Sequence, residues 1–142
     1  MRVNYCSLGG AFVSPEPVPP ERSVRSGTVR FRIRLDSHHY VTVRVYETLK
    51  EMHRASKELH GEPCHPTEAA NTIVFPDAPG GCIAAMLFTW KFSPAYLIVH
   101  EVSHAAVAAV VRIGPGLSPD EDEPLAMFNE KIFRAIFRRI HA

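Results

Sequence analysis

Two histidines and a glutamate stand at helical spacing in the apolar run "YLIVHEVSHAAVAAVV", residues 96–111. His100 and His104 are four residues apart, so on a helix both imidazoles lie on one face, one turn apart, where they could hold one ion. Glu101 follows His100 directly and points along the helix flank toward a ligand of that ion. Polar groups in a buried segment cost free energy unless something pairs with them, and a metal ion would supply that charge.

The pattern H-E-x-x-H predicts hydrolysis assisted by Zn²⁺, with the two imidazoles as ligands and the glutamate as general base. Zinc lowers the pKa of its bound water to about 7. Glu101 would take a proton from that water and return it to the leaving nitrogen. A catalytic zinc ion also needs a third protein ligand and one open position, so another segment must contribute a side chain.

Carboxylates crowd the segment "SPDEDEPLAMFNE", residues 118–130, which follows this helix after a short loop. We expect Glu123 to be the third ligand, with Glu121 as the second candidate and Asp120 as the third. Glu130 could instead accept a hydrogen bond from a histidine N–H. The alternative is that the acidic cluster only favours the N-terminus of the next helix through its dipole.

The sequence "SPAYLIVHEVSHAAVAAV" followed by "DEDEPLAMF" resembles small H-E-x-x-H metallopeptidases of the gluzincin type, especially compact microbial and phage-encoded domains. The resemblance covers roughly residues 80–135. It implies a zincin-like domain that acts on a peptide or protein substrate. In that family the strand before the metal helix usually binds the substrate by edge pairing, and "CIAAMLF", residues 82–88, occupies that place.

Hydrophobic periodicity predicts an α+β domain. A capping box of Thr48 and Glu51 begins one helix, and Gly61 ends it. The central helix is apolar nearly all round, which predicts burial. The expected architecture is a short, mainly antiparallel sheet packed on the central H-E-x-x-H helix and a C-terminal helix. The expected strands are 29–35, 40–46, 71–77 and 82–88, and the expected helices are 48–61, 94–113 (with Ser93 as N-cap) and 124–141.

The chain of 142 residues is long enough for one domain. A proline-rich stretch, residues 14–27, predicts an extended N-terminal arm over 1–27, followed by a zincin-like metallopeptidase domain over 28–142. Three cysteines without C-x-x-C spacing argue against a disulfide framework and suit a reducing compartment. Because no apolar run reaches about 18 residues and no signal peptide is evident, we expect a cytoplasmic protein without membrane contact.

The favoured hypothesis is therefore a zinc metallopeptidase. One alternative is a catalytically silent metal-binding protein with a regulatory or interaction role, such as a phage accessory factor; another is a hydrolase of non-peptide amides. Tyr96, one turn before His100, could donate to the transition state, but a packed core aromatic is the favoured interpretation. Four arginines could form a basic sheet face for nucleic acid or an acidic partner, although the net charge of +1 favours ordinary pairing with carboxylates. These arginines are Arg30, Arg32, Arg34 and Arg44.

Overall fold

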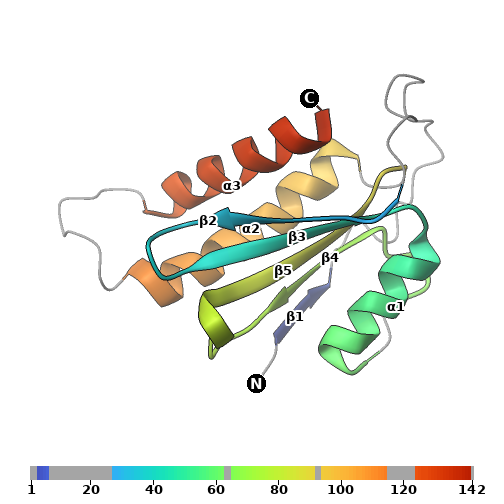
Figure 1. Ribbon diagram of the computed structural model, residues 1–142, viewed down its shortest axis with the longest axis horizontal. Coiled ribbons are helices and arrows are strands. Elements are labelled where there is room, and N and C mark those ends of the chain that lie inside the picture. The colour runs from blue at the N-terminus through green and yellow to red at the C-terminus, as the bar shows by residue number, and fades with distance from the viewer. Residues whose placement is uncertain (1–2, 7–26, 63–64, 92–93, 115–123, 142) are drawn as a thin grey trace.

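The chain folds as an α+β domain, with helices packed on a five-stranded sheet (Figure 1). The structure is a computed structural model that describes residues 3–6, 27–62, 65–91, 94–114 and 124–141. The strands are β1 (Val3–Cys6), β2 (Val29–Arg34), β3 (Tyr40–Tyr46), β4 (Ala70–Val74) and β5 (Cys82–Thr89). The helices are α1 (Leu49–His60), α2 (Ala95–Ile113) and α3 (Pro124–His141), and a 3-10 turn, Pro79–Gly81, precedes β5.

The predicted α+β class and the order of its elements are confirmed, with small shifts of the boundaries. Thr48 caps α1 by accepting a hydrogen bond from the Glu51 N–H at 3.1 Å, and Gly61 ends the helix with a φ of 94°. α2 begins at Ala95 with Pro94 at the N-cap position, whereas the expected cap, Ser93, lies outside the described residues. β1 lies within the segment that was expected to be an extended arm, and the sequence analysis did not anticipate this strand.

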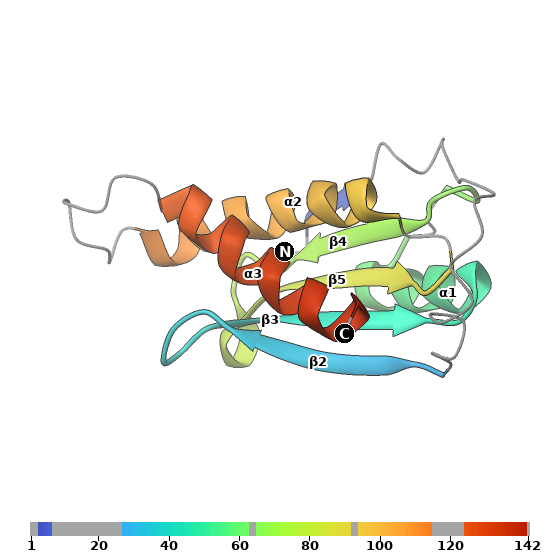
Figure 2. The ribbon, with the colours of Figure 1, turned by 90° about the horizontal axis from the view of Figure 1, so that it is seen from above.

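The strand order is β1-β4-β5-β3-β2 (Figure 2). Three of the four pairings are antiparallel, as expected, while β3 and β5 pair in parallel. A parallel pair needs a long crossover, and here α1 and β4 supply it between the two strands. The central strand is therefore β5, and β1 and β2 lie at the two edges of the sheet.

The helices cover opposite faces of the sheet, with α2 and α3 on one side and α1 on the other (Figure 1). Successive side chains of each strand point to opposite faces of the sheet, so the core has two parts, one under α1 and one under α2 and α3. Ile73 and Leu87 pack in a cluster with Met52 of α1. Their neighbours Met86 and Phe88 belong to the larger cluster that includes the inner residues of α2 and α3.

A tight turn fixes the β2–β3 hairpin and the register of its arginines. One carboxylate oxygen of Asp36 accepts hydrogen bonds from the backbone N–H groups of His38 and His39, both at 2.7 Å. Gly81 packs against this turn with a φ of 91°, and a Cβ there would lie 2.1 Å from the carbonyl oxygen of His38. Only glycine allows this close backbone approach.

Candidate metal centre

His100 and His104 meet on α2, as their spacing predicts. Their Nε2 atoms are 3.1 Å apart, and the two rings are nearly perpendicular, at 84°. Two imidazole nitrogens bound at about 2.05 Å to one tetrahedral Zn²⁺ would stand roughly 3.3 Å apart. The pair therefore has nearly the separation that a shared ion requires, without a change in the course of the helix.

The surroundings of His104 favour its neutral form. Burial lowers the pKa of this histidine, and the nearby His100 lowers it further. A histidine binds metal through a neutral imidazole nitrogen, so a lowered pKa keeps this ligand available near neutral pH.

Glu101 is fully buried and lies on the side of α2 that faces the sheet. Its backbone carbonyl oxygen accepts a hydrogen bond from the Thr72 hydroxyl of β4 at 3.2 Å. This bond fixes α2 against β4 at the residue that follows the first histidine. The contact joins residues 29 positions apart, and no local sequence pattern announces it.

The third ligand stays a prediction. Glu123, Glu121 and Asp120 all lie outside the described residues. Within the part of the chain that the structure describes, no three His, Cys, Asp or Glu side chains form a group that could hold a metal ion. Glu130 does not serve as a histidine acceptor there; its exposed carboxylate pairs with Arg134 one turn further along α3. Glu130 therefore lies on the exposed side of α3, where its carboxylate forms an i,i+4 ion pair with Arg134.

α2 is not buried on all sides, contrary to the expectation from its composition. Its outer face exposes large apolar side chains beside the histidines, and the expectation that Tyr96 packs in the core is wrong, because 53% of Tyr96 is exposed. The helix is apolar all round, but the sheet and α3 cover only part of its circumference. The exposed residues of α2 are Tyr96, Val99, Val107 and Val111.

About one turn beyond His104 along α2, a hollow of about 240 Å³ lies between α2 and the ends of β4 and β5. Val107, Ala108, Val111 and Arg112 line it from α2, and the first three follow His104 on the same flank of the helix. The facing wall is formed by Val74, Phe75, Pro76 and Ile83. The hollow could receive an apolar side chain of a molecule bound at the histidine pair.

α2 also meets a length and hydropathy criterion for a membrane span, with a mean hydropathy of 1.4. This is weak evidence, because core helices meet the same criterion and half of the stretch is buried within this fold. The expectation of a protein without membrane contact stays a prediction.

Comparisons of the chain with protein-family models, with curated proteins and with solved structures found no match.

Proposed function

We propose that this protein is a cytoplasmic zinc-dependent peptidase, in which His100, His104 and Glu123 hold the metal and Glu101 is the general base. The observation that carries the proposal is the 3.1 Å separation of the two histidine Nε2 atoms. When bound, the zinc would supply a water of lowered pKa and polarise the carbonyl to be attacked. Glu101 would accept the proton of that water and pass it to the leaving amine.

The structure changes the expected path of the substrate. Residues 82–88 were expected to bind a peptide by edge pairing, but β5 is hydrogen-bonded to β3 on one side and to β4 on the other. β4 is the strand joined to α2 through Thr72, and its outer edge is paired with β1. An extended peptide would therefore pair with β4 in the place that β1 occupies, antiparallel to β4.

The exposed apolar face of α2 supports the same path. An extended peptide beside β4 would direct alternate side chains toward α2. Val107 and Val111 could then contact apolar side chains at the 240 Å³ hollow. This arrangement favours substrates with an apolar residue near the cleaved bond.

The alternative is a metal-binding regulatory or interaction protein without turnover. The described residues group no third ligand with the histidine pair, and the candidates Asp120, Glu121 and Glu123 lie outside them. In that case the two histidines would hold an ion, and a side chain of a partner protein would complete its coordination.

The experiment measures zinc content and hydrolysis of unfolded casein by the full chain and by four variants. E101Q should keep its zinc and lose hydrolysis, whereas H100A should lose both. E123Q should lose most of its zinc, and E121Q is its matched control, which should retain it. Hydrolysis by E101Q at the rate of the unaltered protein would contradict the peptidase proposal, and zinc content unchanged in H100A would contradict the metal site.

A further inference from the structure

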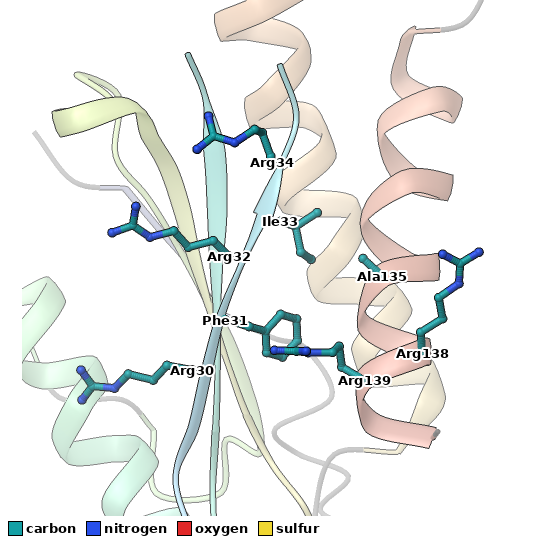
Figure 3. Close-up of a pocket in the computed structure, with 8 residues that line it drawn as sticks. All are labelled: Arg30, Phe31, Arg32, Ile33, Arg34, Ala135, Arg138 and Arg139. Carbon is teal, nitrogen blue, oxygen red and sulfur yellow. The ribbon is translucent and has the colours of Figure 1, made fainter. Parts of the chain in front are cut away.

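The arginines of the β2–β3 hairpin gather like charges on one face of the sheet. Figure 3 shows Arg30, Arg32 and Arg34 pointing to the same side of β2, away from α3. Arg44 of β3 is the direct cross-strand partner of Arg30. Like charges in directly opposite positions destabilise a sheet. The expected pairing with carboxylates is not seen, since none of these four arginines forms an ion pair within the described ranges.

Three of these arginines line one pocket of about 400 Å³. They are Arg30, Arg32 and Arg44; Arg34 lies on the same face but outside the pocket. Pockets for small ligands typically have volumes of roughly 300–1,000 Å³. The lining contains no carboxylate, and its other members are Phe31, Tyr40, Thr42, Phe75, Cys82 and Ala85.

The donors in this pocket are held in place and one of them lacks an acceptor. The Nε atom of Arg44 is buried and has no hydrogen-bond partner among the described residues. A buried donor without an acceptor costs free energy, and the negative charge of an anion bound nearby would offset part of that cost. Arg32 lies over the ring of Tyr40, with its Cζ atom 4.4 Å from the ring centre, and this contact orients its guanidinium plane.

The arginines of β2 also border a hollow on the α3 side of the strand. This second hollow, of about 620 Å³, lies between β2 and α3 (Figure 3). Its lining contains Arg30, Arg32 and Arg34 of β2 as well as Phe31, Ile33, Ala135, Arg138 and Arg139. There Arg139 lies over the ring of Phe31, at 4.8 Å from the ring centre. The side chains of Arg30, Arg32 and Arg34 point away from α3 (Figure 3), so their guanidinium groups lie on the other side of β2 from Arg138 and Arg139.

We propose that the pocket of Arg30, Arg32 and Arg44 binds the phosphate group of a small organic phosphate. A phosphate monoester carries a charge of about −1.5 to −2 and three strong acceptor oxygens, whereas a carboxylate carries one charge. Guanidinium groups bind phosphate through paired hydrogen bonds, and two of the three already balance its charge. Phe75 and Ala85 would contact the organic part of the ligand.

A single phosphate ester fits better than a nucleic-acid strand. Proteins bind single strands by stacking bases on open aromatic rings along a basic groove. In this pocket Arg32 already covers the ring of Tyr40. The pocket also lies on the face of the sheet opposite α2, so the proposal does not depend on the metal site.

The test is calorimetric titration of the full chain with phenyl phosphate and with inorganic phosphate. We expect saturable one-to-one binding that R30Q weakens by about tenfold, as for the loss of a hydrogen bond to a charged group. R34Q is the matched control, because it removes the same charge from the same strand outside the pocket, and should change the affinity less than twofold. R30Q removes a like-charge contact with Arg44, so its fold should be kept.

A second measurement locates the ligand. Cys82 lines the pocket and is partly exposed, so bound phenyl phosphate should slow the alkylation of Cys82 by iodoacetamide. Peptide mapping measures the extent of this alkylation. Equal losses of affinity in R30Q and R34Q, or unprotected Cys82, would overturn the proposal in favour of diffuse electrostatic attraction. Oligothymidylate that binds more tightly than phenyl phosphate and responds to R34Q would overturn it in favour of nucleic acid. Zinc content should be the same in R30Q as in the unaltered protein, which separates this outcome from the peptidase proposal.

Discussion

The hydroxyl of Thr72 on β4 donates a hydrogen bond to the backbone carbonyl oxygen of Glu101 on α2. Both residues are buried, and the bond ties the helix that carries the histidine pair to the strand beside it. The position of the site relative to the edge of β4 depends on this contact.

Thr72→Val should therefore lower the free energy of unfolding by about 1 kcal/mol, because it removes one buried hydrogen bond. For a chain of this size the melting temperature should fall by about 3 °C. Thermal unfolding followed by circular dichroism measures the change. Thr28→Val, at an exposed position, is the control and should leave the melting temperature nearly unchanged. Equal effects of both substitutions would show that the bond contributes nothing.

The lowered pKa of His104 predicts a dependence of stability on pH in protein freed of metal by a chelator. The folded state resists protonation of this histidine, so the unfolded state binds more protons below the ordinary histidine pKa of 6.5. The free energy of unfolding should be highest above pH 6.5, where His104 is neutral in both states, and should fall as the pH drops from 6.5 toward the folded-state pKa. Urea unfolding at a series of pH values should show a smaller decline for H104Q than for the unaltered protein. An identical decline would assign the effect to other groups.

Zinc should stabilise the folded protein, since the histidine pair exists only in the folded helix. At a free concentration 100 times the dissociation constant, a ligand that binds only the folded state adds about 2.7 kcal/mol. The melting temperature should rise with zinc in the unaltered protein and in H38A, which changes an exposed histidine of the β2–β3 turn. It should not rise in H104A. A rise of the same size in H104A would place the zinc elsewhere.

Removal of residues 1–6 should open the outer edge of β4. If peptides pair with that edge, the shortened protein should cleave casein several times faster than the full chain. A synthetic peptide of residues 1–6 added back should then inhibit it competitively. Faster cleavage without inhibition by the peptide would mean that the deletion acts by loosening the fold, and hydrogen exchange at β4 would report that loosening.

The sequence predicts most elements because their periodicity is strong and local. β2 and β3 alternate cleanly, and α1 carries both a capping box and a glycine stop, so the boundaries follow from the residues at their ends. β1 has no such signal, because its four residues form a strand only by pairing with β4. Val3 pairs with Val74, which lies 71 positions later in the sequence. The site divides in the same way. Helical spacing predicts the meeting of His100 and His104, while the contact of Thr72 with Glu101 depends on tertiary packing.

Composition misleads at α2 for a physical reason. An apolar helix predicts burial, but burial also requires enough neighbouring elements to surround it. The sheet covers one side and α3 a second, which leaves Val107 and Val111 at the surface. The number of covering elements is a property of the whole fold and cannot be obtained from the helix alone.

The central place of β5 has a consequence for synthesis. Among the strands that the structure describes, β5 is the last along the chain, yet it alone joins the β2–β3 hairpin to the pair of β1 and β4. Until residue 89 has left the ribosome, the nascent chain holds two incomplete sheets whose inner edges have no partner. Such edges are prone to pair with other chains. A message truncated before Cys82 should therefore yield aggregated product, whereas one truncated after α2 keeps the whole sheet.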